Sequence, residues 1–202
     1  TLCTNLVLPS SHPEAQAGYI IIEPASYPPM SGTNTICTAT VLLETGMIPM
    51  QEPVTNLVLE APAGLIHITA ECRNGKVEGI TFRNRPSFVM HRDKVIEVPG
   101  HGAVRVDVAY GGMIYVILNA ADLGFAITPD EARELSDVGE TVKRAAAEQL
   151  PSVHPENPDI HTINQTLWAG PLVEKDGVKS SRNGVIVSPG RLDRSPCGTG
   201  TC

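Results

Sequence analysis

Two short segments of the sequence share one pattern of residues that could do chemistry. Ser31-Gly32-Thr33-Asn34-Thr35 matches Cys197-Gly198-Thr199-Gly200-Thr201: each has a hydroxyl or thiol, then Gly-Thr, a turn-forming residue and a second Thr. A glycine after the reactive atom lets the backbone approach a ligand closely. Successive N–H groups that open a helix make a concave anion site, which the helix dipole strengthens. The repeat therefore predicts two equivalent anion-binding segments that together could hold one carboxylate.

That arrangement suits removal of the α-proton of an amino acid. The Cα–H group is a very weak acid, so an enzyme without a cofactor must neutralise the carboxylate as the carbanion forms, and must exclude water. Helix N-termini supply that charge, and they lower the pKa of a cysteine placed there to between about 3.5 and 7.5. Cys197 is thus predicted to be available as a thiolate base. By itself the Ser31 segment would be interpreted as an ordinary helix cap. Its repetition at Cys197 favours a catalytic role for both segments.

The residues around both segments resemble those of a known family. Asp193–Thr201 is similar to the second active-site signature of the proline racemase family, and Met30–Thr35 to the first, which usually reads Met-Cys-Gly-His. The similarity extends to His12–Ala15, Glu44–Met50, Pro62–Gly64 and Tyr110–Gly112. Family members are longer at both ends, so we expect this chain to be a fragment.

The resemblance implies an α+β fold of the diaminopimelate epimerase type. Such a fold has two pseudo-symmetric halves of mainly antiparallel strands around a central helix, with the active site in the cleft between them. Residues 1–99 would form the first half and residues 100–202 an incomplete second half. The implied roles are catalysis by Ser31 and Cys197, carboxylate binding by Gly32, Thr33, Gly198 and Thr199, and pairing of Asp193 with the ring nitrogen of the substrate. The resemblance implies no cofactor and no metal.

Ser31 departs from the family pattern. Racemases and epimerases of the family place Cys at both positions, because two-base inversion needs two groups that exchange protons near neutral pH. A serine hydroxyl is a much poorer base, and this disfavours inversion more than loss of a β-hydroxyl, which needs no reprotonation at Cα. The resemblance thus favours a trans-3-hydroxy-L-proline dehydratase that yields 1-pyrroline-2-carboxylate. Family stereochemistry favours Ser31 as proton acceptor and Cys197 as donor to the leaving hydroxyl, whereas thiol acidity favours the reverse order.

Alternatives stay open: 4-hydroxyproline 2-epimerase, proline racemase, a non-catalytic binder of amino acids, or an inactive truncated family member. Hydroxyproline epimerases carry a His on the strand before the second signature, where our alignment places Gln165, with His161 nearby. This difference favours the dehydratase, although an insertion near Glu174–Val178 loosens the register. Thr33 in place of the usual His alters the hydrogen bonding beside the substrate.

Two helices are expected to position these residues. Ile36–Leu43 is apolar almost all round, which predicts a buried helix with Asn34 and Thr35 as caps and Gly46 at its C-terminal end. A second, amphipathic helix begins with a capping box at Thr128; its apolar stripe consists of Ala132, Leu135, Val138, Val142, Ala146 and Leu150.

Short strands separated by turn signals fill the rest of the chain. The predicted strands are Leu6–Leu8, Tyr19–Ile22, Val54–Leu59, Leu65–Cys72, Val77–Phe82, Val95–Val98, Val104–Ala109, Met113–Leu118, Ile163–Trp168 and Val185–Val187. Asn74-Gly75 is typical of a hairpin turn. Tyr110-Gly111-Gly112 fits either a strand bulge or a backbone that approaches the site. Mixed strands and helices indicate an α+β fold, with a boundary near Pro99–Gly102.

Composition limits the partners. The 202 residues carry a net charge of −7 with a sequence pI near 5.3, and show no basic run, which excludes a nucleic acid or an anionic membrane as expected partners. The most apolar stretch, Met113–Ala121, is too short to span a bilayer, and the first residues do not resemble a signal peptide. We therefore expect a cytoplasmic enzyme with a small-molecule substrate. Homodimers are common in the family, but the sequence leaves the oligomeric state open.

The number and spacing of the cysteines indicate that they are reduced thiols. Five cysteines stand in no zinc-like spacing, which favours reduced thiols over a disulfide framework or a metal site. Cys37 and Cys72 lie in apolar segments and are predicted to be buried.

Overall fold

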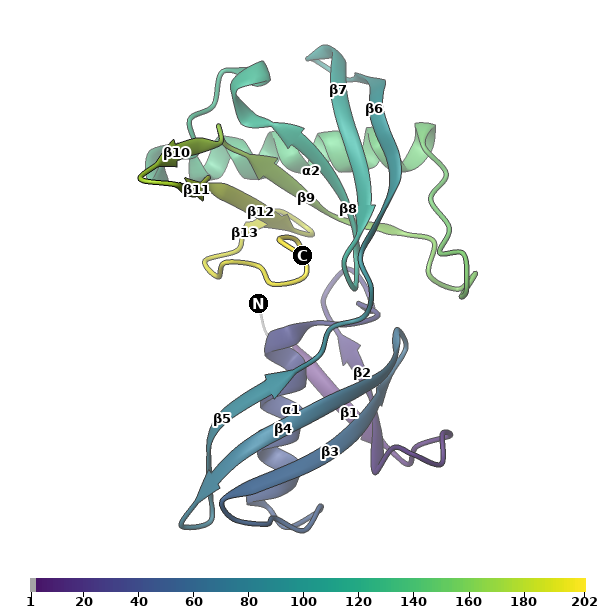
Figure 1. Cartoon of the computed structure of the whole chain (residues 1–202). Helices are drawn as coiled ribbons and strands as arrows, with labels where there is room; N and C mark the ends of the chain where they lie inside the picture. The colour runs from purple at the N-terminus through teal and green to yellow at the C-terminus, as the bar shows by residue number, and fades with distance from the viewer. Residues whose placement is uncertain (1–2) are drawn as a thin grey trace. The chain divides into compact units, whose positions relative to one another are not determined.

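The computed structural model describes residues 3–202, and the chain divides into two compact units, Thr1–Pro86 and Ser87–Cys202. Each unit contains one long helix and one mixed sheet, labelled in Figure 1. No helix among residues 3–202 is long and apolar enough to cross a membrane.

The first unit is a five-stranded sheet packed on α1 (Gly32–Glu44). In spatial order its strands are β1 (Thr4–Leu8), β2 (Ala17–Ile22), β3 (Val54–Ala61), β4 (Gly64–Arg73) and β5 (Lys76–Phe82). Neighbours are antiparallel except β2 and β3, which are parallel because α1 forms the crossover between them. Alternate residues of β3 and β4, including Leu59 and Ile66, are buried in one core with Leu42 of α1.

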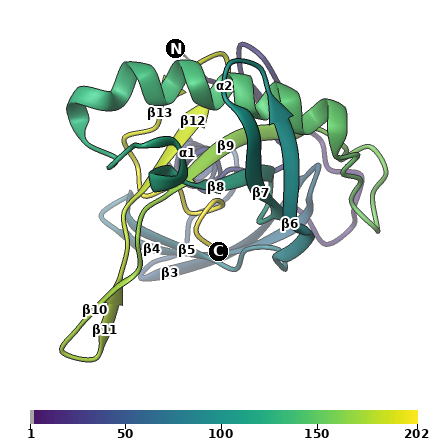
Figure 2. The same cartoon turned by 90° about the horizontal axis from the view of Figure 1, so that it is seen from above.

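The second unit is a six-stranded sheet packed on α2 (Ala132–Gln149). In spatial order its strands are β13 (Arg191–Leu192), β12 (Asn183–Val187), β9 (Ile163–Ala169), β8 (Ile114–Asn119), β7 (Gly102–Tyr110) and β6 (Phe88–Val98). Two 3-10 helices, Ala120–Leu123 and Pro129–Glu131, precede α2, and a separate hairpin of β10 (Val173–Lys175) and β11 (Val178–Ser180) extends away from the sheet (Figure 2). Only β8 and β9 are parallel, and α2 is their crossover.

Both units thus contain a strand–helix–strand crossover, β2–α1–β3 and β8–α2–β9, within a mainly antiparallel sheet. This confirms the predicted α+β class and the repetition of one architecture in two halves. The predicted boundary near Pro99–Gly102 lies in the turn between β6 and β7, whereas the two compact units divide between Pro86 and Ser87. Because these strands pair along their length, the hairpin lies wholly within the second unit.

The second helix was predicted in detail. Glu131 accepts a hydrogen bond of 2.8 Å from the Thr128 N–H, which completes the capping box, and the centre of the apolar stripe is buried. The helix approaches β12 and β9 closely at Gly139, where a Cβ atom would lie 2.7 Å from Ile186 of β12 and 3.2 Å from Trp168 of β9. Trp168 of β9 donates from Nε1 to the carbonyl of Leu135 at 3.1 Å. These contacts fix α2 against the centre of the sheet.

The first helix differs from its prediction. It begins at Gly32 with Ser31 as the N-cap, several residues before the expected caps, because the Thr35 N–H already bonds to the Ser31 carbonyl at 2.9 Å. It is also not buried all round, since Val41 is 55% exposed. Cys37 is exposed as well, so its predicted burial was wrong, whereas Cys72 is buried as predicted. An apolar sequence does not reveal which face has a partner.

Candidate active site

The first signature lies at the N-terminus of α1. The N-cap residue Ser31 has extended backbone angles, and its Oγ accepts a hydrogen bond of 2.9 Å from Asn34 Nδ2. Gly32 and Thr33 follow in the first helical turn, whose N–H groups have no acceptor within a helix and therefore suit an anion. A Cβ at Gly32 would lie 3.0 Å from the ring of Phe82, so glycine permits the end of β5 to approach this turn.

The second signature follows β13. Cys197 is 6% exposed and has a φ of 53°, a left-handed conformation that costs a non-glycine residue about 1 kcal/mol or more. A chain of hydrogen bonds holds it: Ser195 donates from its N–H and its Oγ to the two carboxylate oxygens of Asp193, at 3.0 and 2.7 Å, and the Cys197 N–H donates to Ser195 Oγ at 3.1 Å. A carboxylate accepts about four hydrogen bonds, so Asp193 keeps capacity for a cationic nitrogen.

The two signatures make equivalent local hydrogen bonds. Thr35 donates from N and Oγ1 to the carbonyl of Ser31, at 2.9 and 2.8 Å. Thr201 does the same to the carbonyl of Cys197, at 3.1 and 2.9 Å. The sequence repeat therefore corresponds to a repeated turn, which begins α1 in the first unit and is formed by Gly198–Gly200 in the second unit.

Tyr115 on β8 contacts the second signature and belongs to the candidate site, although sequence reasoning missed it. Its hydroxyl lies 2.6 Å from Thr199 Oγ1 and 3.4 Å from Cys197 Sγ, and its side chain is buried in a cluster with Met113, Leu167 and other apolar residues. The available signal was a second repeat, Tyr-Ile-Ile-Ile in β2 and Tyr-Val-Ile-Leu in β8. A tyrosine in an apolar strand by itself indicates only a core residue.

The electrostatics of Cys197 differ from the prediction. Burial raises the pKa of its thiol, and the negative charge of Asp193 acts in the same direction. The hydrogen bonds from Tyr115 and the Gly200 N–H lower the pKa but do not outweigh burial. The predicted thiolate is therefore not favoured at neutral pH, because desolvation of the buried sulfur exceeds the effect of one helical turn.

Gly111 brings the backbone of the strand end against the second signature. A Cβ at this position would lie 2.1 Å from the carbonyl oxygen of Thr199, so no other residue fits without moving one of the two segments. Of the two readings of Tyr110-Gly111-Gly112, the structure supports the close approach of backbone to the site.

The strand position that carries His in hydroxyproline epimerases was aligned to Gln165. Gln165 lies on β9, is 4% exposed, and pairs in register with Tyr115 of the neighbouring β8. His161 precedes β9, is exposed and contacts the Pro158 carbonyl at 3.1 Å. The structure thus places Gln165, and not His161, beside a residue that contacts Cys197. The insertion near Glu174–Val178 is the β10–β11 hairpin and leaves the register of β9 intact.

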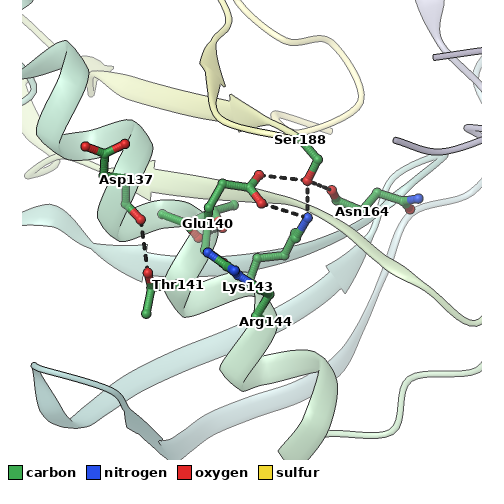
Figure 3. A network of polar contacts seen from close by, with 9 residues as sticks. Asp137, Glu140, Thr141, Lys143, Arg144, Asn164 and Ser188 are labelled. Carbon is green, nitrogen blue, oxygen red and sulfur yellow. Dashed lines mark hydrogen bonds and ion pairs between the residues drawn. The ribbon is translucent and has the colours of Figure 1, made fainter. Parts of the chain in front are cut away.

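A polar network on α2 holds the turn before the second signature (Figure 3). Ser188 donates to Glu140 Oε1 at 2.7 Å and also contacts Lys143 Nζ, which pairs with Glu140 at 3.1 Å. Ser188 further contacts the carbonyl of Asn164 on β9. Because Ser188 follows β12 directly, the network fixes the turn into β13 and hence the start of the segment that carries Cys197.

The chain is similar to proteins of known family and structure. The profile of the proline racemase family matches residues 1–202, so the chain belongs to that family. It is 39% identical to a hydroxyproline epimerase from Agrobacterium vitis, solved with bound trans-4-OH-L-proline, with a TM-score of 0.88. It is 38% identical to a probable proline racemase from Agrobacterium radiobacter K84, solved with bound carbonate, with a TM-score of 0.87. Each comparison covers 98% of this chain and 57% of the other.

This chain therefore spans less than two thirds of the length of either protein. A methylitaconate-delta-isomerase is 14% identical over 98% of this chain and 64% of its own, with a TM-score of 0.50, and shares the fold alone.

Proposed function

We propose that this chain carries the catalytic residues of a cofactor-independent trans-3-hydroxy-L-proline dehydratase. The observation that carries the proposal is the chemical inequality of Ser31 and Cys197. Ser31 Oγ accepts a hydrogen bond from Asn34, whereas burial raises the pKa of the Cys197 thiol and keeps its proton in place at neutral pH. A base on one side and an acid on the other suit elimination better than reversible inversion. Family membership and the similarity to a protein with bound trans-4-OH-L-proline support a proline-type substrate.

In this proposal the hydroxyl proton of Ser31 passes to solvent water, and the resulting alkoxide oxygen takes the α-proton. The Asn34 amide and the N-terminus of α1 both favour negative charge on that oxygen. The electrons of the Cα–H bond form a Cα=Cβ bond while the C–O bond breaks, and Cys197 gives its proton to the departing hydroxyl, which leaves as water. The enamine then isomerises to 1-pyrroline-2-carboxylate.

The remaining signature residues bind the substrate. The backbone of Gly32 and Gly198 and the side chains of Thr33 and Thr199 hold the carboxylate, and Asp193 pairs with the cationic ring nitrogen. Thr33 is exposed at the start of α1, and Thr199 is 8% exposed beside Cys197. Cytoplasmic location and a homodimer belong to the same proposal by family resemblance.

The second candidate is inversion at Cα, as a 4-hydroxyproline 2-epimerase or proline racemase. The 39% identity to a hydroxyproline epimerase favours it. Ser31 argues against it, because a hydroxyl opposite a thiol makes a poor two-base pair.

The test incubates the protein with trans-3-hydroxy-L-proline, trans-4-hydroxy-L-proline and L-proline, and follows pyrroline formation and optical rotation. We expect pyrroline from the first substrate, and a loss of at least about 100-fold in Ser31→Ala and in Cys197→Ser. Cys3→Ser, which removes an exposed thiol in the first unit, is the matched control and should keep the rate. Inversion of trans-4-hydroxy-L-proline without any pyrroline would overturn the dehydratase, and binding of all three substrates without turnover would show an inactive member.

A further inference from the structure

Tyr115 joins the two polar side chains of the second signature through a single hydroxyl. The oxygen lies 2.6 Å from Thr199 Oγ1 and 3.4 Å from Cys197 Sγ, and the tyrosine is 1% exposed. The surrounding cluster of Met113, Leu167 and Val185 is apolar. The three groups therefore form a short hydrogen-bonded row within an apolar cluster.

The number of protons in this row limits its arrangements. When Cys197 is a neutral thiol, its S–H can donate to the tyrosine oxygen, and the tyrosine O–H can then donate to Thr199 Oγ1. The Thr199 proton is then directed at an acceptor outside the row. When Cys197 is a thiolate, the tyrosine O–H must turn to the sulfur, because a charged acceptor forms the stronger hydrogen bond. The Thr199 proton is then drawn inward to the tyrosine oxygen.

We propose that Tyr115 is a positioning residue that couples the protonation of Cys197 to the binding of a substrate carboxylate by Thr199. This inference rests on the proposed function of Cys197 and Thr199. A neutral thiol permits the arrangement in which the Thr199 hydroxyl is free to hold the carboxylate, and the S–H then turns from the tyrosine oxygen to the leaving hydroxyl. After Cys197 has donated its proton, the hydrogen bonds in the row reverse direction and the Thr199 hydroxyl donates to the tyrosine oxygen. Thr199 then binds the product carboxylate more weakly.

The tyrosine itself stays protonated throughout. Burial raises its pKa well above the ordinary value, and negative charge on Cys197 and Asp193 acts in the same direction. Asp193 is the charged group that acts on both members of the row, and it raises the pKa of Cys197 too. The tyrosine proton therefore only changes its hydrogen-bond acceptor, from Thr199 Oγ1 to Cys197 Sγ, and does not leave the phenol.

The first unit contains a comparable pair that lacks a thiol. Tyr19 on β2 is buried, and its hydroxyl lies 2.6 Å from Thr35 Oγ1, which in turn donates to the Ser31 carbonyl at 2.8 Å. A buried Tyr–Thr pair thus supports each signature. In the first unit the Tyr19–Thr35 pair contacts the backbone carbonyl of Ser31, which cannot ionise as the Cys197 thiol can. Tyr19 therefore provides a structural comparison for Tyr115.

The test measures the ionisation of Cys197 directly, by alkylation with iodoacetamide across pH and mass spectrometry of the peptide that contains it. In Tyr115→Phe we expect the alkylation midpoint to move to higher pH, because the thiolate loses a donor. We also expect KM for the substrate to rise on the order of tenfold, since Thr199 loses its orienting partner. With 3-fluorotyrosine at position 115, a stronger donor of nearly the same shape, the midpoint should move to lower pH.

Tyr19→Phe is the matched control, because it removes a buried hydroxyl with the same 2.6 Å contact to a threonine. It should lower stability by a similar amount and leave the alkylation profile of Cys197 unchanged. Equal profiles for Tyr115→Phe, Tyr19→Phe and the parent protein would overturn the proposal, as would a fluorotyrosine midpoint that does not fall. Absence of pyrroline in the parent protein would instead refute the proposed function, and the alkylation result does not depend on it.

Discussion

At Cys197 opposing effects set the pKa of the thiol. Hydrogen bonds from Tyr115 and the Gly200 N–H stabilise the thiolate, whereas burial and the charge of Asp193 destabilise it, and burial dominates. A buried sulfur loses the hydration that a charged form needs. This residue is thus suited to give a proton at neutral pH, which is the role that elimination requires.

Replacing Ser31 by Cys tests whether this residue selects the reaction. In Ser31→Cys both positions would carry thiols, the pattern of the racemases and epimerases in the family. We expect the ratio of inversion to pyrroline formation to rise on the order of 100-fold, because a second thiol can accept and return a proton at Cα. Polarimetry and a pyrroline assay on the same sample give this ratio. An unchanged ratio would show that Ser31 does not decide between the two reactions.

Glu60 provides a pH-dependent contribution to stability. Its carboxylate accepts hydrogen bonds from Ser10 and Ser11, both through Oγ at 2.6 Å, and these lower its pKa from 4.5 to about 2. A lowered pKa in the folded state stabilises the protein above pH 4.5, and this stabilisation is lost as the pH falls from 4.5 towards 2. We expect Glu60→Gln to cost about 1 kcal/mol at pH 7.

Urea denaturation of Glu60→Gln and the parent protein at several pH values measures this contribution. The difference in unfolding free energy should shrink as the pH falls below 4.5. Glu14→Gln, which removes a carboxylate close along the chain to Ser10 and Ser11, serves as the control. A constant difference from pH 7 to pH 3 would contradict the assignment.

At the scale of elements, the turn between β7 and β8 limits where the second signature can lie. In Gly111→Ala the new Cβ would be 2.1 Å from the Thr199 carbonyl oxygen, so backbone must move. We expect a loss of about 3 kcal/mol in the free energy of unfolding. Gly18→Ala is the matched control in the first unit, since its Cβ would meet neighbours at ordinary distances of 3.6 to 3.7 Å. Calorimetry of both variants should separate them, and equal losses would contradict the close approach.

The network between α2 and the turn after β12 should show strong coupling. Lys143→Met leaves Glu140 partly buried without its cation, which we expect to cost about 2 kcal/mol. The double variant Lys143→Met/Glu140→Gln removes both charges and should cost less than the sum of the single variants. A double-mutant cycle in urea measures this coupling. Additive losses would mean that the two charges stabilise the turn independently.

Sequence patterns of a few residues correctly predicted the helices and turns that are determined by contacts between near neighbours along the chain. The capping box at Thr128 and the apolar stripe specified α2, and Asn74-Gly75 forms the turn between β4 and β5 with both residues at positive φ. Gly46 ends α1 with a φ of 73°, as predicted. In each case the determining contacts lie within a few residues along the chain. The sequence repeat at Ser31 and Cys197 likewise corresponds to a turn with the same local hydrogen bonds.

Contacts between distant segments could not be predicted in this way. Tyr115 is separated from Cys197 by 82 residues and meets it only because β8 lies at the centre of the sheet. Asn34 was interpreted as a turn former and cap, yet its side chain reaches back to Ser31 Oγ. The pKa of Cys197 was predicted in the wrong direction because burial is a property of the folded unit.

At the scale of the whole molecule, the proposed function requires Ser31 and Cys197 to act on one substrate. This requirement is testable with a disulfide in the variant Ser31→Cys. A disulfide demands Cα atoms within about 7 Å, so it forms only if the two positions meet during the motions of the protein. We expect mild oxidation to link the two positions and to abolish activity, and a reductant to restore it.

The exposed thiols Cys3, Cys37 and Cys202 must first be replaced by serine, so that Cys72, which is buried, is the remaining background thiol. Substrate present during oxidation should slow the link, because a bound proline ring would separate the two sulfur atoms. Non-reducing peptide mapping detects the link, and the same protein with Ser31 retained is the control. If oxidation leaves both thiols free while substrate still turns over, the two signatures do not share one substrate, and the proposed division of labour between Ser31 and Cys197 must be abandoned.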